Sequence, residues 1–219
     1  MITAKESKPA TAAATGPEAT GQLPKVAVVV PSGDMVHADF ALALAGMCHS
    51  SGALTVDIFS AKSSIVAEAR NIGVDLALEA GAEYMLFLDS DMTFPRTALL
   101  WLLLHRQDVV GATYPKRVPP YTVLGTPVEP AAADAPARLI EMTRIPTGCL
   151  LIRMSVFERL SRPYFRFGIN EDTGHILGED YMFCDRVREA GFRIWCDWAL
   201  SQELGHIGQQ VQRLPKPAP

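Results

Sequence analysis

The sequence lacks a close pair of cysteines, a long apolar run and an excess of positive charge. Its four cysteines lie far apart, which excludes a C-x-x-C zinc or redox motif and predicts reduced, partly buried thiols. The longest strongly apolar stretch, 98–104, is far shorter than the roughly 20 residues that cross a bilayer. Twenty lysines and arginines stand against 24 acids, so no global basic field is available to hold nucleic acid or an anionic membrane.

The two ends of the chain are polar and rich in alanine, threonine or proline. Residues 1–23 contain no apolar segment typical of a secretory signal, so we expect a cytoplasmic protein. We expect 1–23 to be a disordered tail, 24–208 a single domain and 209–219 a flexible tail. A domain of this size leaves little room for a second domain, so any further binding surface would come from its own loops or from a partner subunit in a homo-oligomer.

Short apolar runs alternate with helical patterns over the first half of the chain. The predicted strands are 25–31, 55–60, 84–88 and 108–113, and the predicted helices are 40–48, 65–80 and 95–106. Further along we predict an irregular excursion at 118–138, a strand leading into a helix at 152–160, a helix at 181–190 and a strand at 192–198. This order predicts an α/β fold with an open, mostly parallel sheet, right-handed crossovers and helices covering it.

Two carboxylates, Asp89 and Asp91, follow the third predicted strand with Ser90 between them. Ligands of open α/β sheets bind at the carboxyl ends of the strands. Two acids there need compensating charge, and Mg²⁺ or Mn²⁺ supplies it while bridging to ligand phosphates. The alternative is that Asp91 caps the next helix and Asp89 lies in a solvated turn.

Six separated segments together resemble the family-2-like glycosyltransferases of GT-A fold. They occur in that family's order over nearly the whole core: ARN at 69–71, FLDSDM at 87–92, GATYPKR at 111–117, PTGCLLIR at 146–153, GEDYMFCDRVREAGFRIWCD at 178–197 and GHIG at 205–208. The resemblance implies a Rossmann-like nucleotide-diphospho-sugar transferase fold with helices on both faces of the sheet. It also implies a UDP- or GDP-sugar donor held through its diphosphate by Mn²⁺ or Mg²⁺.

The same resemblance implies roles for individual residues. Asp91 would be the direct metal ligand, Asp89 would contact the ribose or a metal-bound water, and His206 would be a further ligand. The implied donor-binding set is Pro31, Ser32, Ser60, Arg70, Asn71, Asp89, Ser90, Asp91, Thr147 and Gly148. The acid that the family often places near the second strand is missing unless Asp57 serves, so the nucleobase stays open.

Asp180 is the candidate general base of an inverting transfer, with Glu179 beside it to orient acceptor or sugar. Both acids would also suit the start of a helix without any catalytic role. A helix start lowers the pKa of a carboxylate, so the role of Asp180 as a base requires a raised pKa or close substrate geometry. Lys116 and Arg117 are candidates for contact with phosphate or acceptor, or a surface pair.

Two other functions fit parts of the sequence. FLDSDMT also matches the pattern of haloacid-dehalogenase-like phosphatases, with Asp89 as nucleophile and with Asp180 and Asp185 as a later acidic pair. That family places its nucleophile on the first strand, whereas two predicted strands precede Asp89 here. The third alternative is a non-catalytic nucleotide-sugar-binding module, because a fold alone does not fix function. Sugar, acceptor and stereochemistry stay open.

Overall fold

The computed structural model describes residues 23–136, 138–208 and 211–212. Most of the two predicted tails lies outside these residues. The exceptions are residue 23 and Val211–Gln212, and the latter two residues form a short strand. The helices are α1 (Ala38–Ser50), α2 (Val66–Glu79), α3 (Ala98–Leu104), α4 (Ser155–Glu158), α5 (Glu179–Glu189) and α6 (Trp198–Ser201). The strands are β1 (Lys25–Ser32), β2 (Thr55–Lys62), β3 (Tyr84–Leu88), β4 (Met92–Thr93), β5 (Val109–Gly111), β6 (Thr126–Pro127), β7 (Leu139–Arg144), β8 (Cys149–Arg153), β9 (Gly168–Ile169), β10 (Ile176–Leu177), β11 (Ile194–Asp197), β12 (Gly205–Ile207) and β13 (Val211–Gln212).

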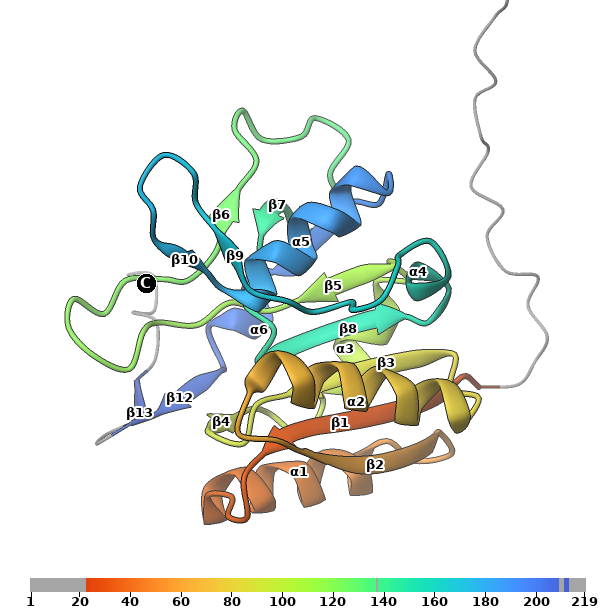
Figure 1. Cartoon of the computed structure of the whole chain (residues 1–219). Helices are drawn as coiled ribbons and strands as arrows, with labels where there is room; N and C mark the ends of the chain where they lie inside the picture. Colours follow the sequence, from red (N-terminus) through yellow and green to blue (C-terminus); the bar gives the residue numbers. More distant parts are fainter. Residues whose placement is uncertain (1–22, 137, 209–210, 213–219) are drawn as a thin grey trace, which may run out of the picture.

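Eight strands form the central sheet in the order β2-β1-β3-β8-β5-β11-β7-β6 (Figure 1). The pairs β1–β2, β1–β3 and β5–β11 are parallel, and the other four pairs are antiparallel. Strands β7 and β8 therefore run against the other six. The sheet is mixed, and it departs from the predicted parallel order where β8 inserts between β3 and β5. A continuous apolar run such as β8 predicts a buried strand but does not encode its direction.

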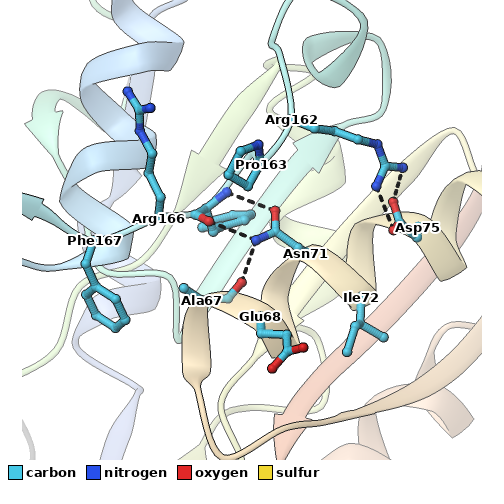
Figure 2. Close-up of a pocket in the computed structure, with 10 residues that line it drawn as sticks. Ala67, Glu68, Asn71, Ile72, Asp75, Arg162, Pro163, Arg166 and Phe167 are labelled. Carbon is cyan, nitrogen blue, oxygen red and sulfur yellow. Dashed lines mark hydrogen bonds and ion pairs between the residues drawn. The ribbon is translucent and has the colours of Figure 1, made fainter.

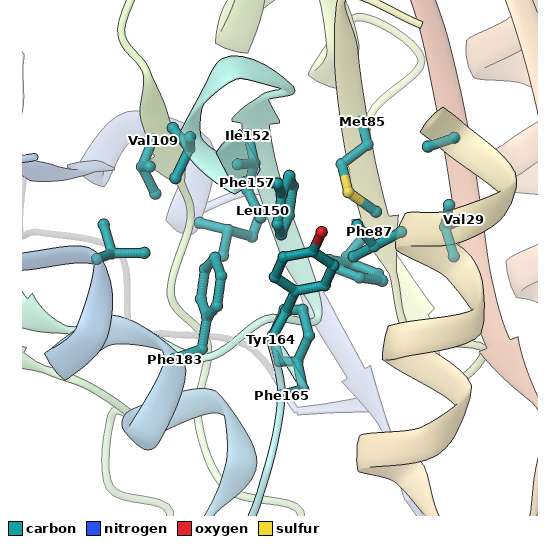
Figure 3. Close-up of a cluster of buried hydrophobic side chains, with 14 of the residues drawn as sticks. Val29, Met85, Phe87, Val109, Leu150, Ile152, Phe157, Tyr164, Phe165 and Phe183 are labelled. Carbon is teal, nitrogen blue, oxygen red and sulfur yellow. The ribbon is translucent and has the colours of Figure 1, made fainter. Parts of the chain in front are cut away.

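Helices cover both faces of this sheet, as the alternating pattern predicts. Successive residues of β1 point to opposite faces, so Ala27 and Val29 join one buried cluster while Val26 and Val28 join the other. Helices α2, α4 and α5 contribute to the first cluster and α1, α3 and α6 to the second. In the first cluster (Figure 3), the rings of Phe165 and Phe183 stack with their centroids 4.4 Å apart. This stacking holds the stretch between α4 and β9 (159–167, called the 160s segment below) against α5.

The carboxyl ends of β1, β2, β3 and β5 lie at one edge of the sheet because these strands share a direction. Asp89, Ser90 and Asp91 form a turn between β3 and β4, called the D-x-D turn below, and β4 joins the small sheet β13-β12-β4. Helix α5 begins after the β9–β10 hairpin. No helix in the described ranges is long and apolar enough to cross a membrane.

Candidate active site

Asp91 and His206 face each other at the carboxyl edge of the sheet. Strand β12 pairs with β4, and this pairing sets His206 opposite Met92, beside Asp91. The Nε2 atom of His206 lies 3.6 Å from Oδ2 of Asp91. The Nδ1 atom lies 2.9 Å from the carbonyl oxygen of Pro115, and the ring packs edge-on against Tyr114 with centroids 4.9 Å apart. His206 is therefore held with one ring nitrogen aimed at a carboxylate.

This pair fits a divalent cation on chemical grounds. A carbonyl oxygen can only accept a hydrogen bond, so Nδ1 of His206 carries the proton. In the neutral ring the lone pair of Nε2 then points at the Asp91 carboxylate, an arrangement that a cation between them would stabilise. A histidine that donates its second ring N–H to a carbonyl is the usual form of a metal-ligating imidazole. Mn²⁺ accepts such a mixed nitrogen and oxygen set more readily than Mg²⁺, which favours oxygen.

Asp91 also makes an ion pair with Arg117, whose Nη1 lies 2.7 Å from Oδ2. Burial by itself raises the pKa of Asp91. The facing His206, in the form that also carries a proton on Nε2, and the charge of Arg117 outweigh burial, so the net pKa of Asp91 lies below its usual range. This ion pair sets Arg117 at the D-x-D turn, and its contact with phosphate or acceptor stays a prediction. The guanidinium thus offsets the charge of Asp91.

Arg70 joins the D-x-D turn to the start of α5. Its side chain is buried, donates from Nε to Oε1 of Glu179 at 3.0 Å and donates from Nη2 to Oδ2 of Asp89 at 3.2 Å. Burial lowers the pKa of Arg70, but the charges of Asp89 and Glu179 raise it more, so the guanidinium stays charged. Both acids therefore share one cation, and the role of Glu179 in orienting acceptor or sugar stays a prediction.

The three predicted metal ligands are not gathered into a single cluster. Among the described residues, no group of three or more His, Cys, Asp or Glu side chains is arranged to hold a metal ion. Asp91 and His206 face each other, whereas Asp89 is turned toward Arg70. Oδ1 of Asp89 lies 3.0 Å from Nη2 of Arg70, so this oxygen belongs to the ion pair. Within the described residues, Nη1 of Arg70 is buried without a hydrogen-bond partner. An unpaired buried donor indicates a place for a polar ligand or water, and metal binding stays a prediction.

Asp180 lies in the first turn of α5 with a pKa raised to about 6. Burial is the main cause and the neighbouring charge of Glu179 the second, while the hydrogen bond from the backbone N–H of Tyr181 at 2.8 Å opposes them. The helix start alone would lower this pKa, so burial outweighs it. The raised pKa that a general base requires is thus present.

Three residues of the implied donor-binding set, Pro31, Ser32 and Ser60, come together at the ends of β1 and β2. The hydroxyl oxygens of Ser32 and Ser60 lie 3.2 Å apart, and Pro31 is paired in register with Ala61 beside them. Asp57 lies nearer the start of β2, where its Oδ2 is 2.9 Å from Nζ of Lys25. Asp57 therefore does not supply an acid at this edge, because the register places it away from the carboxyl end of the strand.

Asn71 uses its side-chain amide to hold the backbone. Its nitrogen donates to the carbonyl oxygens of Ala67 and Phe165 at 2.7 and 2.8 Å, and its oxygen accepts from the N–H of Phe165 at 3.0 Å (Figure 2). These bonds fix the 160s segment to α2, beside an open groove of about 630 Å³. The sequence pattern does not separate this positioning role from the predicted donor contact, which stays a prediction.

Thr147 and Gly148 border the D-x-D turn directly. The backbone N–H of Asp89 donates to the carbonyl of Gly148 at 3.1 Å, and the N–H of Gly148 donates to the hydroxyl of Tyr114 at 3.0 Å. Thr147 is buried, and Ser90 lies partly exposed in the turn itself. Tyr114, which contacts both Gly148 and His206, was not among the predicted site residues. Its place within GATYPKR, at the end of a buried strand, is the signal that could have identified it.

We predict that Gly148→Ala destabilises the protein by about 1–3 kcal/mol, the usual cost of overpacking. A methyl group on Gly148 would overlap the Tyr114 hydroxyl and approach Oδ2 of Asp89. Urea unfolding measures the loss, and Tyr114→Phe in the same chain should recover part of it. Gly46→Ala is the matched control, because the nearest atom to its new methyl would be 3.9 Å away in an open helix position. An equal or greater loss in Gly46→Ala would contradict the prediction.

Comparisons with known proteins support the fold alone. No family model matches the chain, and no curated protein matches its sequence. The crystal structure of A197 from STIV is similar over 89% of this chain and 96% of that chain, with a TM-score of 0.58 and 16% identity. The staphylococcal glycosyltransferase TarS (S. aureus, residues 1–349) aligns with 78% of this chain and 57% of that chain at 15% identity. Its TM-score of 0.47 is too low to carry an inference about this chain.

Proposed function

We propose that this chain is a glycosyltransferase that moves a sugar from a nucleotide-diphosphate donor to an acceptor hydroxyl. The observation that carries the proposal is the Arg70 bridge, which brings the D-x-D turn and the start of α5 to one place. These are the two segments that would hold the donor and the acceptor. Asp180, with its raised pKa, follows Glu179 directly at that place.

Asp180 acts as the general base in this proposal. It takes the proton of the acceptor hydroxyl while the acceptor oxygen bonds to the anomeric carbon and the bond from that carbon to the diphosphate breaks. A carboxylate with a pKa of about 6 is mostly ionised at pH 7 and is a stronger base than an ordinary aspartate. Attack opposite the diphosphate inverts the anomeric configuration, so a product with retained configuration by NMR would contradict this assignment.

The leaving diphosphate carries the charge that the site must balance. Asp91 and His206 would hold Mn²⁺ or Mg²⁺, whose chemistry there is to neutralise that charge. Arg117, which pairs with Asp91, would meet a phosphate oxygen, and Ser32 and Ser60, whose hydroxyls lie close together, would meet the nucleoside. Arg70 keeps Asp89 and Glu179 fixed while substrates exchange.

The phosphatase alternative finds less support in the structure. It would need Asp185 to work with Asp180, but Arg144 binds the Asp185 carboxylate through two hydrogen bonds of 2.9 and 2.7 Å. Two strands of the sheet also precede Asp89, as the sequence predicts. A non-catalytic module would bind the same donor, and turnover distinguishes it from an enzyme.

We predict that UDP or GDP together with Mn²⁺ raises the melting temperature of the wild-type protein. In His206→Ala, the apparent affinity obtained from this shift should be at least tenfold lower. The reason is that His206 supplies one of two facing ligands. Differential scanning fluorimetry with metal and nucleotide varied separately measures it. His49→Ala, an exposed histidine at the end of α1, should behave as wild type. Equal shifts in wild type and His206→Ala would contradict this metal assignment.

A further inference from the structure

Two loops that are anchored near the start of α5 expose large apolar side chains. The first is the β9–β10 hairpin with the residue that leads into it, and the second is the 116–123 loop after β5. Figure 1 shows both loops projecting from the same side of the molecule. The exposed side chains are Phe167, Ile169, Ile176, Val118, Tyr121 and Val123. Among them Ile169 and Ile176 are 69% and 77% exposed.

Both loops are attached to the first turn of α5. Gly168, in β9, packs so closely on Met182 that a methyl group there would overlap its sulfur. Beyond the 116–123 loop, the backbone N–H of Gly125 donates to the Tyr181 hydroxyl at 3.0 Å. The loop itself is closed by a hydrogen bond of 3.0 Å from the N–H of Lys116 to the carbonyl of Thr122. Because Tyr181 and Met182 directly follow Asp180 in α5, both loops are anchored within one helical turn of the base.

The charges on these loops favour an uncharged occupant. Lys116 and Arg117 stand on the 116–123 loop, whereas Glu171 and Asp172 stand at the tip of the hairpin, so neither sign dominates. An anionic membrane or a nucleic acid would need a surplus of positive charge. Exposed apolar side chains that gather beside a polar site mark a surface that contacts a ligand.

We propose, resting on the glycosyltransferase function above, that the acceptor is amphipathic. Its reacting hydroxyl meets Asp180, and its uncharged alkyl or aromatic body lies between the β9–β10 hairpin and the 116–123 loop. A purely polar sugar would leave these side chains in water when bound. The apolar body instead removes them from water, and the affinity of the acceptor increases with the length of that body.

Isothermal titration calorimetry with methyl, hexyl and octyl β-glucoside, each below its micellar concentration, tests this proposal. In the wild type we expect the affinity to rise at least tenfold from methyl to octyl. The double variant Ile169→Ser/Ile176→Ser should lose this gain, and both positions are exposed enough to leave folding intact. Leu104→Ser is the matched control, because Leu104 is 76% exposed at the end of α3, before β5.

Equal affinity across the series, or a gain that the double variant keeps, would overturn the amphipathic acceptor. The proposal would also be overturned if the apolar loops bound neutral vesicles while the affinity for the glucosides did not depend on chain length. Release of nucleoside diphosphate without acceptor is measured in parallel, because it reports the proposed function alone. The double variant should match the wild type in that assay. A wild type that releases none would count against the transferase function and leave the calorimetric result to decide the apolar site.

Discussion

Asp180→Asn is expected to lower kcat for sugar transfer by about 10²–10⁴-fold, the usual contribution of a general base. In the wild type, kcat/KM should rise as the pH increases through about 6, where Asp180 loses its proton, and then level off. The variant should lose this dependence because an amide does not titrate. The pH profiles of both proteins, measured with saturating donor, make the comparison. A variant that keeps the full rate or the same profile would contradict the role of Asp180.

The same substitution should stabilise the folded protein at high pH. The pKa of Asp180 in the folded state lies well above its ordinary value, so the folded state binds the proton more tightly than the unfolded state does. Stability therefore falls as the pH rises from about 4 through 6, and the ionised carboxylate costs about 3 kcal/mol at pH 8. Asp180→Asn should recover this amount at pH 8 and little at pH 4, as urea unfolding at both values would show. Lost stability at pH 8 would contradict the raised pKa.

Arg70→Met is expected to destabilise the protein by about 3–5 kcal/mol, because it leaves two acids near the core without their cation. Arg70 is 3% exposed, and its partners Asp89 and Glu179 lie on different elements that it holds together. Arg70→Lys keeps the charge but not the fork that reaches both acids, so we expect an intermediate loss. Urea unfolding at pH 7 gives the free energies.

Arg162→Met is the matched control for this experiment. Arg162 also pairs with an acid through two nitrogen atoms, but its partner Asp75 lies on the exposed side of α2 and both groups are solvated. Exposed pairs contribute about 0–1 kcal/mol, so the control should change little. A loss in Arg70→Met no greater than that in Arg162→Met would mean that the buried bridge does not stabilise the site.

The elements with strong local patterns were the ones the sequence could predict. The strands at β1, β2, β3, β5 and β11 and the helices on both faces follow from runs and spacings that belong to each segment. Strand β7 was missed, because Leu139–Arg144 alternates with polar residues beside a proline-rich stretch. The antiparallel insertion of β8 depends on the path of the chain around the sheet, which no local pattern records.

The candidate site also has features that the sequence could predict and features that it could not. The D-x-D turn, His206 and Asp180 could be named because each carries a recognisable residue pattern, and the structure places Asp91 beside His206. The burial of Arg70 could not be predicted, since a charged residue on an amphipathic helix normally faces water. The direction in which the pKa of Asp180 is shifted could not be predicted either, because burial around α5 outweighs the effect of the helix start.

The most direct test of the account is release of nucleoside diphosphate from a panel of UDP- and GDP-sugars in the presence of Mn²⁺. The wild type should release it from at least one donor, slowly with water and faster with an acceptor hydroxyl. Asp180→Asn should show no acceleration by acceptor. If no donor is turned over while p-nitrophenyl phosphate is hydrolysed, the chain is a phosphatase and the transferase account is wrong.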